Sequence, residues 1–176
     1  MLYHLIINTS YGYCAVIFTK NPFILKKVLL PEKKLKTIKE KILSTASSIE
    51  DKKNTDAKKI AFAIKNYFNN GCPIQIDRDI LDLNNHPPFY KKILLKTAEI
   101  PFAEVCSYRD LSEAANNPKA SRATGGAMAT NPFPIIIPCH RVIKTDGSVG
   151  KFGGGSELKK KMINLERQAN KLPPLY

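Results

Sequence analysis

Residues 107–130 read SYRDLSEAANNPKASRATGGAMAT, and this stretch predicts two short helices joined by a tight turn. Ser107 is a good N-cap residue, and Asp110 stands three positions later, as in a capping box. The turn Asn-Asn-Pro-Lys separates this helix from a second one, which must end at Asn131 because proline follows. Two such helices are a candidate helix-turn-helix for binding DNA, although any α-helical hairpin would give the same pattern.

The second helix carries two glycines at its centre, Gly125 and Gly126, and each costs about 1 kcal/mol relative to alanine. Ala123 and Ala127 beside them are also small, and Arg122 is the long side chain of this surface. Two interpretations are open. The bare backbone allows either close packing against another helix, or close approach to a narrow DNA groove that the arginine enters.

An apolar segment, PFPIIIP at 132–138, follows this helix, and its three prolines exclude a helical conformation. We expect it to be buried and extended, and to present Cys139 on a rigid backbone. A cysteine in such surroundings is most often a structural core residue. His140 and Arg141 favour a reactive thiol instead, because cationic neighbours lower the pKa of a thiol and hold it as the nucleophilic thiolate.

A carboxylate that could orient His140 lies on the helix expected over 156–169. Met162 and Leu165 belong to the apolar stripe of this helix, and Glu166 falls on the same stripe. A buried carboxylate needs a partner. Pairing with His140 would give a Cys–His–Glu relay, whereas a glutamate at the edge of the stripe would pair with a lysine.

The segment KTDGSVGKFGGG at 144–155 has five glycines in twelve residues. Such a segment is either a flexible connection or a wall whose backbone lies close to a ligand. It lacks the motifs of nucleotide-binding loops, so no nucleotide site is expected.

The composition is that of a basic globular protein. The 176 residues are 43% hydrophobic, and 28 Lys and Arg against 15 Asp and Glu give a net charge of +13. No carboxylate occurs between Glu113 and Asp146, so this stretch carries an unopposed positive charge. A polyanion such as DNA would suit it, although a high lysine content can also serve solubility.

Other function classes are not expected. The chain has no apolar run long enough for a membrane helix and no secretory signal, so a cytoplasmic protein without membrane contact is expected. The four cysteines are too few and too scattered for a disulfide framework, and with three histidines no metal site is expected.

Two domains are expected, at 1–85 and 86–176, divided near the linker DLNNHPP. The fold class is α+β: a small N-terminal α/β domain, then a mostly helical domain with the helix-turn-helix. In the first domain the strand patterns cover 2–8, 13–19 and 23–30, and they are followed by a helical stripe through Leu35, Ile38, Ile42 and Ile49 and a helix over 55–71.

The C-terminal half resembles the O6-alkylguanine-DNA alkyltransferases, also called methylated-DNA–protein-cysteine methyltransferases. The resemblance covers roughly 88–167, and it depends on PCHRV at 138–142 together with SRATGGAM at 121–128 and the Asn-Pro pair between them. It implies a ribonuclease-H-like N-terminal domain. It also implies a monomer that repairs double-stranded DNA by irreversible, stoichiometric transfer of the alkyl group from O6-alkylguanine, with O4-alkylthymine as a further candidate substrate. No cofactor is expected.

The resemblance also implies residue roles. Cys139 would accept the alkyl group, and His140, held by Glu166, would deprotonate it through a water. Asn131 would brace the turn that carries the cysteine, and Tyr108 would donate a hydrogen bond to the leaving guanine.

The remaining implied roles concern DNA and the base. Base flipping from the minor groove is expected, with Arg122 filling the gap left by the everted base. The other expected DNA contacts are Ala123, Gly125, Gly126, Ala127 and Arg141, and the expected base pocket consists of Val142, Gly150, Phe152 and Gly153. Phe152 stands where many members of the family have tyrosine.

Two other functions fit the same residues. A transcriptional regulator would use the helix-turn-helix without chemistry. A cysteine hydrolase would use Cys139, His140 and Glu166 and would turn over repeatedly.

Overall fold

The structure is a computed structural model that describes residues 1–176. The chain divides into two compact units, Met1–Asp82 and Leu83–Tyr176. No helix combines the length and the apolar character that crossing a membrane would require.

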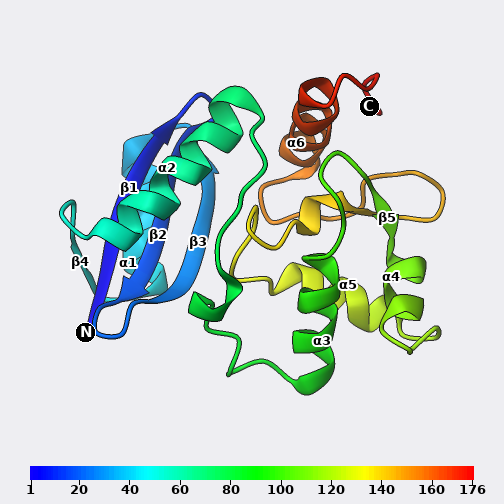
Figure 1. Ribbon diagram of the computed structural model, residues 1–176, viewed down its shortest axis with the longest axis horizontal. Coiled ribbons are helices and arrows are strands. Elements are labelled where there is room, and N and C mark those ends of the chain that lie inside the picture. Colours follow the sequence, from blue (N-terminus) through cyan, green and yellow to red (C-terminus); the bar gives the residue numbers. More distant parts are fainter. The chain divides into compact units, whose positions relative to one another are not determined.

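The first unit is a four-stranded sheet with two helices (Figure 1). The strand order is β3-β2-β1-β4, in which β1 pairs antiparallel with β2 and parallel with β4. The elements are β1 Leu2–Thr9, β2 Gly12–Thr19, β3 Ile24–Glu32, α1 Leu35–Thr45, β4 Ser48–Glu50 and α2 Thr55–Asn70, followed by the short 3₁₀ turn η1 Arg78–Ile80.

Strand β2 is the centre of this unit, because both of its faces are covered. Ala15 and Ile17 pack with Ile38 and Ile42 of α1. The alternate residues of β2, such as Phe18, point to the other face and are also buried. The expected strands and helices are confirmed apart from one residue of the helical stripe, Ile49. It lies in β4 and is 54% exposed, because α1 ends at Thr45.

The second unit is mostly helical. It consists of α3 Pro88–Thr97, β5 Cys106–Ser107, α4 Tyr108–Ala114, α5 Ser121–Ala129, the 3₁₀ turn η2 Cys139–Arg141, β6 Val142–Ile143 and α6 Ser156–Ala169. Helix α3 packs against both α4 and α5. The predicted capping box is present, since the Ser107 hydroxyl accepts a bond from the Asp110 amide and the Asp110 carboxylate accepts one from the Ser107 amide. The α+β fold class is confirmed.

The short parallel pair β5–β6 positions the functional residues. Cys106 pairs with Val142, and Ser107 pairs with Ile143. Because the strands are parallel, Tyr108 and Lys144 leave the pair at the same end. The turn η2, which carries Cys139, directly precedes β6.

Candidate active site

Cys139 lines a pocket of about 870 Å³ in the second unit, although only 5% of its surface is exposed. Three segments form the pocket wall. Tyr108 and Arg109 come from α4; Ser121, Arg122, Gly125, Met128 and Ala129 come from α5; and Lys144, Thr145, Gly150, Lys151, Phe152 and Gly153 come from the glycine-rich segment after β6. The sulfur therefore faces a space shared by the second predicted helix and the glycine-rich wall.

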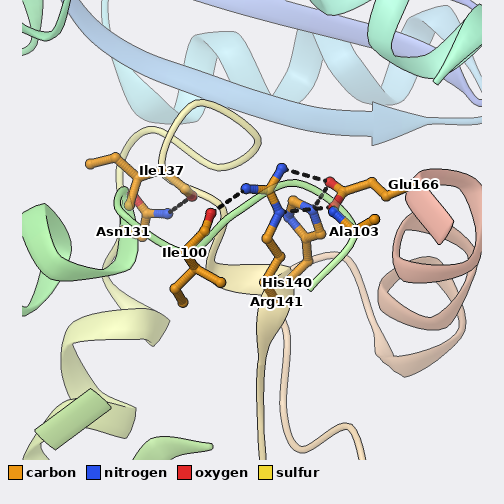
Figure 2. A network of polar contacts seen from close by, with 7 residues as sticks. All are labelled: Ile100, Ala103, Asn131, Ile137, His140, Arg141 and Glu166. Atoms are coloured by element: carbon orange, nitrogen blue, oxygen red, sulfur yellow. Dashed lines mark hydrogen bonds and ion pairs between the residues drawn. The ribbon is translucent and has the colours of Figure 1, made fainter. Parts of the chain in front are cut away.

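The two residues after Cys139, His140 and Arg141, belong to a buried polar network that converges on Glu166 (Figure 2). His140 Nε2 lies 2.6 Å from Glu166 Oε1, and the two side chains are 0% and 1% exposed. The amide of Ala103 donates to Oε2 at 3.1 Å. The sequence-based pairing of Glu166 with His140 is the one found, and the alternative pairing with a lysine is not.

Arg141 completes this network. Its Nε donates to Glu166 Oε2 at 2.8 Å, and its Nη2 donates to Glu166 Oε1 at 3.1 Å. Its Nη1 donates to the carbonyl of Ile100 at 2.7 Å. All three guanidinium nitrogens thus have protein acceptors, and the residue is buried. The expected contact of Arg141 with DNA does not fit this position, because the guanidinium is committed to a buried carboxylate.

The charges of the pair follow from these contacts. Burial lowers the pKa of His140 below its ordinary value, in spite of the opposing effect of Glu166, so the imidazole is neutral at rest. Burial alone would raise the pKa of Glu166. It is outweighed by His140, through its hydrogen bond and its charge once the ring is protonated at low pH, and by the hydrogen bonds and charge of Arg141, which together lower the pKa of Glu166 to about 2. Glu166 is therefore ionised, and it can stabilise a proton that His140 takes up.

The thiol itself differs from the expectation. Burial raises the pKa of Cys139, and a side-chain hydrogen bond with Asn131 and the charge of Lys159 oppose this only in part. His140 and Arg141 do not hold the sulfur as a thiolate, because the imidazole is neutral and the guanidinium faces Glu166. The resting sulfur is a thiol that needs a base.

Lys159 on α6 is a candidate site residue that the sequence analysis did not include. Its side chain is fully buried, and its Nζ donates to the carbonyl of Val142 at 2.5 Å and lies 5.7 Å from the centre of the Tyr108 ring. Burial lowers its pKa to about 8, against the effect of Cys139. The signal was present, because Lys159 stands three and four residues before Met162 and Ile163, on the buried stripe that ends at Glu166.

Asn131 closes a loop beside the cysteine. Its Nδ2 donates to the carbonyl of Ile137 at 2.9 Å, and its Oδ1 accepts from the amide of Phe133 at 3.0 Å. Both ends of the apolar segment 133–137 are thereby tied to one side chain, two residues before Cys139.

The small residues of α5 divide between two surfaces. A Cβ on Gly125 would meet nothing within 4 Å, whereas a Cβ on Gly126 would lie 2.5 Å from the Tyr90 hydroxyl of α3. Ala127 is fully buried, and Ala123 is half-buried. Ala127 is buried and the side-chain direction of Gly126 is occupied by Tyr90, so the expectation that these two residues contact DNA has no support in their surroundings and stays a prediction. Gly125 keeps an open side, and it lines the pocket.

The predicted base pocket is only partly as expected. Phe152 and Gly153 line the pocket, and so does Gly150, whose Cβ, if present, would lie 3.2 Å from the Tyr108 hydroxyl. Val142 does not line it, because its side chain is fully buried and only its carbonyl is used, by Lys159. No group of three or more His, Cys, Asp or Glu side chains is close enough together to hold a metal ion.

Comparison with known proteins finds similarity over the second unit. Residues 88–168 match the family model described as 6-O-methylguanine DNA methyltransferase, DNA binding domain. Similar curated proteins are methylated-DNA–protein-cysteine methyltransferases. That of Rattus norvegicus is 47% identical over 76 residues, or 43% of this chain and 36% of the relative. That of Haemophilus influenzae is 38% identical over 109 residues, or 62% of this chain and 60% of the relative. The matches thus span between about a third and three fifths of these relatives.

Solved structures share the fold over nearly the whole chain. The O6-methylguanine methyltransferase of Mycobacterium tuberculosis superposes with a TM-score of 0.76 at 23% identity, covering 96% of this chain and 94% of that one. The corresponding protein of Pyrococcus kodakaraensis gives 0.69 at 24% identity, covering 94% and 99%. At this level of identity the likeness establishes the fold of both units.

Proposed function

We propose, from the match of residues 88–168 to the DNA-binding domain model of the 6-O-methylguanine DNA methyltransferases, that the chain repairs double-stranded DNA by moving the alkyl group of O6-alkylguanine onto its own Cys139. The single observation that carries the proposal is the position of this thiol. It lines a pocket of about 870 Å³ bordered by Arg122 and Gly125, and the next residue along the chain, His140, pairs with the buried Glu166.

The reaction exchanges one bond for another. The sulfur of Cys139 attacks the alkyl carbon in line, the S–C bond forms, the C–O6 bond breaks, and its electron pair stays with the purine oxygen. The thiol gives up one proton, to His140 through a water, and the guanine takes up one proton from water in place of the alkyl group, so the products are S-alkylcysteine and an intact base. Because a thioether has no easy leaving group, each protein reacts once and consumes no cofactor.

The proton moves through the buried relay. His140, neutral at rest, accepts the thiol proton through a water, and the ionised Glu166 stabilises the imidazolium that forms. Lys159 favours the developing thiolate by its charge. Tyr108, whose hydroxyl faces the pocket rim at Gly150, donates a hydrogen bond to the leaving guanine.

The buried position of the thiol requires that the base comes to it. A stacked base exposes only its edges, so the damaged nucleotide must rotate out of the duplex, at a cost of a few kcal/mol. Arg122 is exposed on α5 beside the pocket and can fill the gap. The open side of Gly125 lets the helix approach the minor groove.

The test is transfer itself. The protein is incubated with a duplex that contains O6-methylguanine, and its mass and peptides are measured. We expect one methyl group per protein, on Cys139, and none on Cys139→Ser. Cys106→Ser is the matched control, because Cys106 is the other cysteine of this unit close to the β5–β6 pair, and it should accept the methyl group as wild type does.

Other outcomes would refute this function. A methyl group on another residue, or none, would contradict the assignment of the nucleophile. Repeated turnover of an ester or amide would indicate a hydrolase. Sequence-specific binding with equal affinity for damaged and undamaged DNA, unchanged in Cys139→Ala, would indicate a regulator.

A further inference from the structure

The last residues of the chain fold back along α6. The chain reverses after α6, with the amide of Leu172 bonded to the carbonyl of Arg167 at 2.8 Å. Arg167 Nε in turn donates to the carbonyl of Pro173 at 2.6 Å. Residues 172–176, which we call the tail, are therefore held against the helix by directed bonds.

Asn164 of α6 makes most of the hydrogen bonds between the helix and the tail. Its Oδ1 accepts from the amides of Leu175 and Tyr176 at 2.9 and 3.3 Å, and its Nδ2 donates to the Tyr176 carbonyl at 2.6 Å. One side chain thus makes three bonds to two tail residues. Asn164 is not on the buried stripe of α6 that carries Lys159 and Glu166, so the helix has one face for the thiol and another for the tail.

The tail reaches from α6 to the glycine-rich wall. The hydroxyl of Tyr176 donates to the carbonyl of Gly147 at 2.7 Å. Gly147 has a φ of +83° and lies in the turn that Lys144 closes by two backbone bonds, to Ser148 and from Gly147. The segment that begins with this turn, 144–153, supplies six of the fourteen residues that line the pocket.

This wall has few other long-range anchors. Val149 packs against Ile143 and Ile163. The remaining backbone bonds of the segment are local, such as that from Gly155 to Phe152. Five glycines in twelve residues make a defined conformation entropically costly. A hydrogen bond to the tip of the turn therefore changes how often the wall takes the conformation that fits a base.

We infer that the tail is a clasp and that Tyr176 is a positioning residue, which holds the pocket wall 144–153 in the base-binding conformation through the carbonyl of Gly147. This inference rests on the proposed function. It assigns no chemistry to Tyr176, because the hydroxyl bonds the carbonyl of Gly147 and neither residue lines the pocket. The clasp should affect how well a base is bound, and not how reactive the thiol is.

The test uses the free base O6-benzylguanine, which needs the pocket but no DNA. Tyr176→Phe removes only the hydroxyl, and we expect the concentration for half-maximal benzyl transfer to rise by about two- to tenfold, the range for one lost hydrogen bond. The maximal rate should stay unchanged. Amide hydrogen exchange should become faster at 147–150. Asn164→Ala should act in the same direction and more strongly, and Tyr13→Phe, in β2 of the other unit, should have no effect.

Iodoacetamide alkylates Cys139 without being bound as a base. Its rate therefore distinguishes an effect on base binding from a general loss of structure around the thiol. Its rate should be the same in wild type and Tyr176→Phe. An equal loss of both reactions would overturn the inference, as would unchanged half-saturation and unchanged exchange in both clasp variants. A wild-type protein that accepts no benzyl group would refute the proposed function instead, and hydrogen exchange at 147–150 would still decide whether the clasp holds the wall.

Discussion

At the scale of single residues, α6 carries two buried charged side chains that act on different neighbours. Glu166 collects bonds from His140, Arg141 and the Ala103 amide, and it is the anchor of the relay. Lys159 is the cation that acts on the sulfur of Cys139. Each charge can be removed by a separate substitution. Loss of the Lys159 charge should change the ionisation of the thiol, and loss of the Glu166 charge should change the stability of the fold.

Lys159→Met should make the thiol harder to ionise. Without this charge the pKa of Cys139 rises further, so we expect alkylation by iodoacetamide at neutral pH to slow by about three- to tenfold. The pKa of Lys159 itself is lowered to about 8, so this side chain loses its charge as pH rises above that value. The alkylation rate of the wild type should then approach that of Lys159→Met. The measurement is the pH dependence of Cys139 alkylation by mass spectrometry. Lys160→Met, on the exposed side of the same helix, should follow the wild-type profile.

Glu166→Gln should destabilise the fold at neutral pH by about 3 kcal/mol, because it leaves the buried Arg141 without a counter-charge. The pKa of Glu166 is lower in the folded than in the unfolded protein, so its contribution is present at neutral pH and is lost as pH falls from about 4.5 to about 2. Urea unfolding at several pH values measures both effects. Glu157→Gln, an exposed residue of the same helix, is the control. A variant as acid-sensitive as wild type would contradict the assignment.

At the scale of elements, the nine-residue helix α5 packs against α3 and also borders the pocket, on the side where we propose that DNA binds. Its glycines are adjacent in sequence, yet they serve different surfaces. Gly126 is needed for packing against α3, since Tyr90 occupies the space where a Cβ would be. Gly125 has an open side at the pocket, next to the exposed Arg122.

Leucine should therefore affect a different property at each position: DNA binding at Gly125 and the stability of the fold at Gly126. Gly125→Leu should change the free energy of unfolding by less than about 1 kcal/mol and weaken binding to duplex DNA, because its bulk stands in the groove-facing surface. Gly126→Leu should cost about 1–3 kcal/mol by overpacking against Tyr90. Thermal unfolding and fluorescence anisotropy with a labelled duplex measure the two effects. For the smaller change Gly126→Ala, Tyr90→Phe should restore stability; a failure to do so would mean that another contact is limiting.

At the scale of the whole molecule, positive charge surrounds the pocket. Four cations line it, Arg109, Arg122, Lys144 and Lys151, and no carboxylate does. Part of the net charge of +13 therefore lies at the pocket, where we expect the duplex to bind. We expect these four cations to bind phosphates of a duplex whose damaged base is everted.

The number of phosphates contacted can be measured by salt titration. Each cation that neutralises a phosphate contributes about −0.9 to the slope of log affinity against log salt concentration. We expect Lys151→Gln to make the slope less steep by about this amount, and Lys39→Gln, an exposed lysine of α1, to leave it unchanged. An unchanged slope for Lys151→Gln would place this lysine outside the DNA contact.

Local signals in the sequence determined the elements of this protein and the main candidates for its reacting residues. The capping box at Ser107, the glycine after α2 and the prolines before Cys139 act within a few residues of themselves, so they could be interpreted without a partner. The apolar stripe of the last helix likewise placed Glu166 inside, where His140 was the available partner.

Only the tertiary structure decided which neighbour acts on which group. Arg141 is close to Cys139 in sequence, but in the 3₁₀ turn its side chain points to Glu166, and Lys159, twenty positions along the chain, supplies the charge near the sulfur. In the same way, Tyr90 separates the roles of two adjacent glycines. The direction of a side chain and its degree of burial depend on elements distant in sequence, and no local pattern encodes those contacts.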